Sequence, residues 1–406
     1  MTIKVDVTEI ANRIVTCGVL AKFLPQFKDY PRSGLGVAIP AARMDDYRRG
    51  VHDLFLAEKQ LLGSYSIKTF EERVLSFIAP FIHRGTKPTK EDADTFLEEL
   101  LNVPFEGHDV YRPIFGVEFE PGTNPDPVEL GPFTVYHTHN HAEALDEVMR
   151  RRRSLVLLDK SEHYLIRTRV ESRDGVKALE LADALFDRFE CAIKFMLGPA
   201  SEHIVSVGRS NEPESKRAIV LNSQSGSSES GRKSRAPNVD ISDPFFTAQE
   251  YGFERFWEIF GALSNNELMK KVLLAVDWLG QSIAETVISS AFVKATIALE
   301  VLFTPPKEFI SASVTSSIAE SLAMLLGTDI DSRFATEAEA KRLYGIRSKV
   351  AHHGKSDVDF EDLIAVQHIA REAIMKLLTS VPLESVKDGI ELQKTLKSFK
   401  YSCKPL

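Results

Sequence analysis

The chain contains only three cysteines, Cys17, Cys191 and Cys403, which lie far apart in its 406 residues. This number and this spacing exclude a disulfide framework and a zinc cluster built on cysteine. The sequence also lacks any apolar run of the roughly 18 residues that a membrane-spanning helix needs. The segment from Met1 to Val7 lacks the charged-then-apolar pattern of a signal peptide. These absences lead us to expect a protein of the reducing cytoplasm with no membrane partner.

Motifs of several common enzyme classes are absent as well. The sequence has no phosphate-binding loop of the Gly-x-x-x-x-Gly-Lys kind, no nucleophile elbow and no internal repeat, which excludes ATPases and α/β-hydrolases. Charge is in slight acidic excess, 50 minus 58 or -8, so the whole surface is not suited to coating nucleic acid. Contact with nucleic acid would be local. The basic segments are residues 150–153 and 232–235, Lys341–Arg342 and Lys349, although such runs often form only a solvated face.

An apolar content of 43% is enough for more than one domain, and the hydrophobic patterns predict an α+β protein that is predominantly helical. Residues 1–153 form a mixed α/β N-terminal region of unknown role, with helices over 45–62 and 91–101. Residues 154–240 form a small α/β module, with strands over 155–158, 164–170, 204–207 and 218–221 and a helix over 178–189. The polar stretch 223–231 predicts a linker. A helical domain over 241–385 and a C-terminal tail over 386–406 follow.

The helical domain begins with an aromatic group that we expect in the core, although exposure would make it a platform for stacking bases. Its members are Phe245, Phe246, Phe253, Phe256, Trp257 and Phe260. A helical pattern over 266–303 is too long for one ordinary helix and predicts a break near Gly280. A further helix over 311–326 ends at Gly327. The Thr-x-x-Glu pattern of Thr336 and Glu339 predicts a capping box that starts the next helix.

That helix carries the strongest sign of chemistry in the chain, Arg347 followed by His352, His353 and Gly354. Arginine grips phosphate with a planar fork, and histidine exchanges a proton near neutral pH, so the pair suits phosphodiester cleavage without a metal. At about 100° per residue, Arg347 and His352 stand roughly 140° apart around one helix. Two copies facing each other would bring them together, which predicts a homodimer. The plain structural alternative is an arginine and two histidines that cap a helix end.

The stretch Arg347-Ser348-Lys349-Val350-Ala351-His352 resembles the arginine, four to six residues, histidine motif of HEPN domains, in particular their Apea-like branch. Residues 275–279 and 292–300, the second with its Ala-Leu-Glu ending, resemble the two preceding helices of that branch. The resemblance covers about residues 245–380 and implies a helical bundle that dimerises through the motif helices. It also implies Arg347 and either His352 or His353 as catalytic residues, with Ser348 and Lys349 at the substrate. No metal and no cofactor is expected.

The activity that the resemblance implies is endoribonuclease cleavage, in which the RNA 2′-hydroxyl attacks the adjacent phosphorus. An antiviral defence or toxin effector fits this activity, with a protein or phage-derived trigger acting at the N-terminal region. The alternative is a non-catalytic HEPN scaffold that dimerises and binds RNA or protein. Glu300 either orients Arg347 or a histidine, or forms a surface ion pair.

One other group of residues invites a functional interpretation. His137, His139 and His141 alternate, so in a strand they would share one face and could bind zinc with Glu143 or Asp146. The default interpretation is a polar strand and turn.

Overall fold

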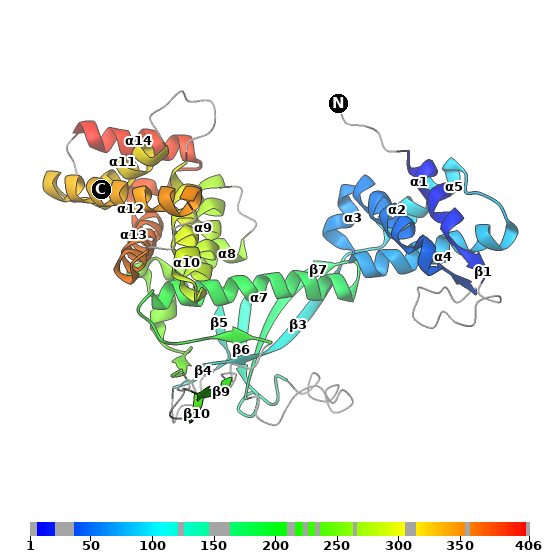
Figure 1. Ribbon diagram of the computed structural model, residues 1–406, viewed down its shortest axis with the longest axis horizontal. Helices are drawn as coiled ribbons and strands as arrows, with labels where there is room; N and C mark the ends of the chain where they lie inside the picture. The colour runs from blue at the N-terminus through cyan, green and yellow to red at the C-terminus, as the bar shows by residue number, and fades with distance from the viewer. Residues whose placement is uncertain are drawn as a thin grey trace. The chain divides into compact units, whose positions relative to one another are not determined.

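The computed structural model describes residues 6–20, 36–120, 126–145, 163–208, 216–221, 226–231, 236–262, 266–304, 314–353 and 358–402 (Figure 1). It confirms the predicted α+β, predominantly helical class. The chain divides into two compact units: unit 1 is Met1–Val110 with Thr168–Ala184, and unit 2 is Tyr111–Arg167 with Leu185–Leu406. The domain boundary predicted at residue 153 lies outside the described residues.

Unit 1 is a cluster of helices around an apolar core that includes Ile14, Tyr47 and Phe70. Its elements are α1 (Val7–Cys17), α2 (Met44–Ala57), α3 (Lys59–Ser64), α4 (Ile67–Arg84), α5 (Lys90–Asn102) and the antiparallel pair β1 (Val19–Leu20) and β2 (Val37–Ala38). The helix expected over 91–101 is α5. The single helix expected over 45–62 is wrong, because Glu58 is extended and its carboxylate accepts the Gln60 N–H at the start of α3.

Two neighbouring side chains join the segments of unit 1 that are distant in sequence. Asp174 accepts the backbone N–H groups of Ser66 and Lys177, both at 2.8 Å. Arg173 donates to the carbonyl oxygens of Leu101 and Val103, also at 2.8 Å. Burial raises the pKa of Asp174, but the hydrogen bonds that its carboxylate accepts, from Ser66 and Lys177 first, outweigh this effect and lower the pKa. The second chain segment of unit 1 is therefore fixed by polar contacts to α3, α4 and α5.

Unit 2 begins with a sheet whose strand order is β5-β6-β7-β3-β8. The strands are β3 (Glu106–Phe115), β5 (Val128–Leu130), β6 (Phe133–His137), β7 (Tyr164–Ser172) and β8 (Ser206–Val207), with β4 (Val117–Glu118) pairing in parallel with β11 (Val239–Asp240). Residues 185–197 of helix α7 (Gly175–Leu197) belong to unit 2 and lie along this sheet (Figure 1). Phe133 of β6 meets Phe189 of α7 edge-to-face at 4.9 Å, which builds the core between sheet and helix.

The predicted α/β module is present in part. Strand β7 and helix α7 correspond to the strand over 164–170 and the helix over 178–189, whereas residues 155–158 lie outside the described residues. The linker expected over 223–231 is wrong for its last six residues. There β10 (Gly226–Gly231) pairs antiparallel with β9 (Lys216–Leu221), because backbone hydrogen bonding to an apolar partner strand suffices to order a polar segment.

The remainder of unit 2 is a helical bundle. Its helices are α8 (Phe253–Gly261), α9 (Glu267–Ala284), α10 (Ile288–Phe303), α11 (Val314–Leu326), α12 (Ile330–His353), α13 (Phe360–Thr379) and α14 (Gly389–Ser402), with short 3₁₀ turns η3 (Pro244–Thr247), η4 (Gln249–Tyr251) and η5 (Val381–Leu383). Helix α10 packs against α9 and α13, and α11 packs against α12. The aromatic group before α9 is core, as expected, since Phe253 and Phe256 are fully buried.

The long helical pattern over 266–303 is broken, but not at the predicted glycine. The break lies at Glu285, whose carboxylate accepts the N–H of Val287 and pairs with Lys294 at 2.8 Å. These contacts lower the pKa of Glu285 to about 2. Gly280 lies inside α9, where a Cβ would come within 2.4 Å of the Cys191 Cα of α7. Gly280 therefore allows α7 and α9 to approach closely. The break in the helix is stabilised by the Glu285 carboxylate instead.

The predicted C-terminal tail is wrong over most of its length, because residues 389–402 form α14 and pack against α11. Gln393 Nε2 donates to Ser321 Oγ at 3.0 Å, and Lys400 Nζ pairs with Glu320 at 2.8 Å. The apolar residues Leu392 and Leu396 are buried, and this burial stabilises the packing of α14.

No helix in the described part of the chain combines the length and the apolar character that a membrane crossing requires.

Candidate functional site

Helix α12, which carries the arginine and histidine motif, begins six residues earlier than the predicted capping box. The Asp329 carboxylate accepts the Ser332 N–H at 2.8 Å, while Ser332 Oγ accepts the Asp329 N–H at 3.0 Å. This reciprocal pair caps the helix, and its hydrogen bonds lower the pKa of Asp329. Thr336 lies inside the helix and donates to the Ser332 carbonyl, so the prediction that Thr336 and Glu339 start the helix is wrong.

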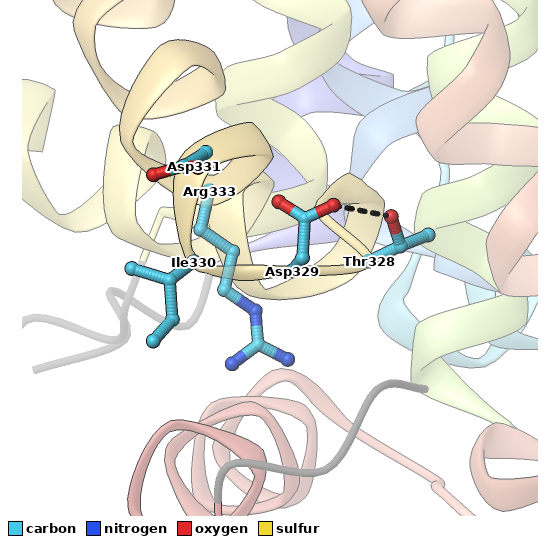
Figure 2. A pocket seen from close by; sticks show the side chains of 5 residues that line it. All are labelled: Thr328, Asp329, Ile330, Asp331 and Arg333. Atoms are coloured by element: carbon cyan, nitrogen blue, oxygen red, sulfur yellow. Dashed lines mark hydrogen bonds between the residues drawn. The ribbon is translucent and has the colours of Figure 1, made fainter.

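The start of α12 borders an open hollow with a volume of about 410 Å³, lined by residues 328–331 and Arg333 (Figure 2). Figure 2 shows the Asp329 carboxylate beside the Thr328 hydroxyl. Free N–H groups at a helix start attract anions. Here the carboxylate of Asp329 already accepts such a group and adds negative charge. We therefore do not place the functional site at this hollow.

Arg347 lies on the other half of α12 and faces a carboxylate on α10. Its Nε is 3.1 Å from Glu300 Oε1, and its Nη2 is 3.5 Å from Glu300 Oε2. The two side chains are only partly exposed, 31% for Arg347 and 25% for Glu300. The Nε atom is buried without a well-aligned hydrogen bond, so the exposed part of the side chain lies elsewhere. Of the two roles expected for Glu300, the structure shows contact with Arg347, in a half-buried ion pair.

Tyr344 lies near this pair, one turn earlier on α12. Its side chain is buried, and its hydroxyl donates to the Thr296 carbonyl of α10 at 3.3 Å. Burial raises the pKa of Tyr344 well above its ordinary value, and the nearby Glu300 carboxylate acts in the same direction. The phenol therefore stays neutral and remains a hydrogen-bond donor. In the sequence, Tyr344 is recognisable only as an aromatic residue on the apolar side of the helix, so this role was not predicted.

The other predicted site residues follow Arg347 on the same helix. Ser348 and Lys349 are exposed. The backbones of His352 and His353 lie in the last turn of α12, as predicted, and their side chains, like Gly354, are outside the described residues. The structure thus keeps the motif on one continuous helix and shows the side-chain environment of its arginine.

The basic segments have different outcomes. Lys341 pairs with Glu337 at 2.6 Å, and Arg342 pairs with Glu339 and with Asp362 of α13, both at 2.7 Å. These two cations are therefore already engaged, and Arg342 ties α12 to α13. Asp362 had no signal in the sequence, because its partner lies 20 positions away across a helix junction. The segments 150–153 and 232–235 lie outside the described residues.

The three alternating histidines do not share a strand face, because β6 ends at His137 and a turn follows. The Nδ1 of His137 accepts the N–H groups of His139 at 3.3 Å and of Asn140 at 3.1 Å. The Nδ1 of His141 accepts the His137 N–H at 2.9 Å. Within the described residues, no three His, Cys, Asp or Glu side chains are grouped so that they could hold a metal ion. These histidines cap a turn.

Comparison with protein-family models, with curated proteins and with solved structures gives no match for this chain.

Proposed function

We propose that this chain is a metal-independent endoribonuclease of the HEPN type. The strongest support for this proposal is the burial of Arg347 and its contact with Glu300. This arginine is half-buried on the motif helix and held against Glu300, and the rest of its side chain remains partly exposed near Ser348 and Lys349. A guanidinium fixed in this way is prepared to stabilise the charge that builds on phosphate oxygens.

In the proposed reaction the RNA 2′-oxygen attacks the adjacent phosphorus, and the bond to the 5′-oxygen of the next nucleotide breaks. The products are a 2′,3′-cyclic phosphate and a free 5′-hydroxyl. Arg347 binds the non-bridging oxygens, and Ser348 and Lys349 assist at the phosphate. One histidine, His352 or His353, takes the proton from the 2′-hydroxyl or gives one to the leaving oxygen. The reaction needs no other reactant.

The exposed face of α12 supports a homodimer. Ile330 and Phe334 are 64% and 68% exposed, and Ala338, Gly345 and Ser348 are also exposed. At about 100° per residue these five positions fall within roughly 80° of one another around the helix. Apolar and small side chains gathered on one face favour close contact with a partner. Arg347 lies outside this face, roughly 100° from its nearest members around the helix.

We place this activity in a reducing cytoplasm, as an antiviral defence or toxin effector that is silent until triggered. The N-terminal region, residues 1–153, would receive the protein or phage-derived trigger. The second candidate is a non-catalytic scaffold that dimerises and binds RNA or protein. The exposed Ile330 and Phe334 favour it equally, because they report on association and not on chemistry.

The first test is RNA cleavage in excess EDTA by the wild type and by Arg347→Ala, His352→Ala and His353→Ala. We expect the wild type to leave 2′,3′-cyclic phosphate ends, and Arg347→Ala to lose at least about 100-fold in rate because a donor to the transition-state charge is gone. One histidine variant should show a similar loss.

Two matched variants serve as controls for this test. Arg49→Ala removes an exposed arginine of α2, and His368→Ala removes an exposed histidine of α13. Both should cut like the wild type. Equal cutting by all variants would refute the assigned site. A dimeric wild type that cuts no RNA would favour the scaffold.

A further inference from the structure

The Glu300–Arg347 pair joins two helices that the bundle packs side by side, α10 and α12. The carboxylate approaches the side edge of the guanidinium, which consists of Nε and Nη2. A guanidinium offers five donors in a planar fork, and its end edge, Nη1 with Nη2, can bind a second group bidentately. One edge can therefore be used for structure while the other is left for a ligand.

The two edges of the Arg347 guanidinium also differ in burial. The Nε atom is shielded from solvent, yet the side chain as a whole is 31% exposed. Tyr344 is fixed through the Thr296 carbonyl and lies close enough for Glu300 and Arg347 to influence its pKa. A long arginine side chain that would otherwise sample many rotamers is thus restricted by a carboxylate.

We propose that Glu300 is a positioning residue that holds Arg347 by an ion pair on its Nε and Nη2 side, with the hydrogen bond made by Nη2, and leaves the Nη1 and Nη2 edge for a phosphate diester. This inference rests on the proposed function and goes beyond it by assigning a role to a residue on a different helix from the motif. Glu300 does not touch the substrate in this scheme. Its loss would leave Arg347 charged but misdirected, so turnover should suffer more than substrate binding.

The experiment compares Glu300→Gln and Glu300→Asp with the wild type in the cleavage assay. Gln keeps the shape but loses the charge that fixes the guanidinium. We expect kcat to fall about 10- to 100-fold with KM changed by less than about threefold, since small misplacement of a catalytic group has costs of this order. Asp should recover part of kcat because it restores the carboxylate at shorter reach.

Glu285→Gln is the matched control. It breaks a half-buried carboxylate–cation pair of similar exposure, 21% for Glu285 against 25% for Glu300, without touching Arg347. It should leave kcat close to that of the wild type. Equal losses in both variants would mean a general structural effect, and a more active Glu300→Gln would mean that Glu300 competes with phosphate. Either result overturns the inference.

A second readout is independent of turnover. The exchange of the Arg347 Nε proton with water, followed by ¹⁵N NMR and assigned with Arg347→Lys, should be slow in the wild type and faster in Glu300→Gln. Unchanged exchange overturns the positioning role whether or not RNA is cut. If the wild type cuts no RNA while exchange responds as expected, the proposed function and the kinetic role of Glu300 fall, and only the structural contact stands.

Discussion

At the scale of single residues, the hydrogen bonds of His137 make the stability of the turn after β6 depend on pH. Its Nδ1 accepts two backbone N–H groups of the turn after β6, which requires an unprotonated nitrogen. Burial, followed by the neighbouring His163, His141 and His139, lowers the pKa of His137 below its ordinary value of 6.5. The Tyr164 ring lies edge-on at 5.1 Å and contributes to that burial.

This lowered pKa predicts a loss of stability in acid. Above the ordinary value both folded and unfolded His137 are neutral; as the pH falls through it, the unfolded state takes up a proton first, so stability decreases until the folded pKa is reached. The melting temperature of the wild type should therefore fall more between about pH 7.5 and pH 5.5 than that of His137→Asn, which accepts N–H groups without titrating. Identical pH profiles for the two proteins would contradict this account.

At the scale of elements, α12 has two candidate N-terminal caps in its sequence, and only one of them caps the helix. Asp329 and Ser332 exchange hydrogen bonds at the helix start, whereas Thr336 bonds to a carbonyl within the helix. Asp329→Ala should lower the melting temperature by about 1 to 3 °C, while Thr336→Ala should change it by less than about 1 °C, because only the first leaves helix N–H groups unsatisfied. Calorimetry of both variants measures this. A larger effect of Thr336→Ala would restore the predicted start.

The elements that the sequence predicted well are those whose signals are local. Helix α5 has the capping box of Thr89 and Asp92 directly before its apolar stripe, and the predicted helix over 91–101 agrees with it. The break between α9 and α10 was misplaced because Gly280 is needed for contact with Cys191, 89 positions away. Likewise, the predicted tail is a helix because α11 offers it a docking surface. Long-range packing decides both the position of the break and the presence of the C-terminal helix. The hydrophobic periodicity of the sequence carries no information about such packing.

The candidate site also contains residues that local spacing predicts and residues that only long-range packing brings in. Arg347, His352 and His353 could be named from spacing, and the structure places all three on one helix. Contact with Arg347 was one of the two roles that the sequence left open for Glu300. The two residues are 47 positions apart, and the packing of α10 against α12 decides whether they meet. Tyr344 and Asp362 were missed for the same reason.

At the scale of the whole molecule, the proposed reaction requires an arginine and a histidine to meet although Arg347 and His352 stand about 140° apart on one helix. Association of two chains through the exposed face of α12 is our solution, and Phe334, 68% exposed, is its most prominent apolar member. Lys341 lies within this face with its ammonium paired to Glu337. Charge on the face is thus balanced within the chain, which leaves apolar contact as the main force for association.

Phe334→Asp should weaken the dimer at least about tenfold, or by about 1.4 kcal/mol, because it places a charge in an apolar contact. Sedimentation velocity over a range of concentrations measures the dissociation constant, and the cleavage assay should lose activity in proportion to the dimer. Val381→Asp is the control, since Val381 is 72% exposed on η5 and away from this face. A monomeric but fully active wild type would refute the dimeric site, because one α12 would then have to bring Arg347 and a histidine to the same phosphate by itself.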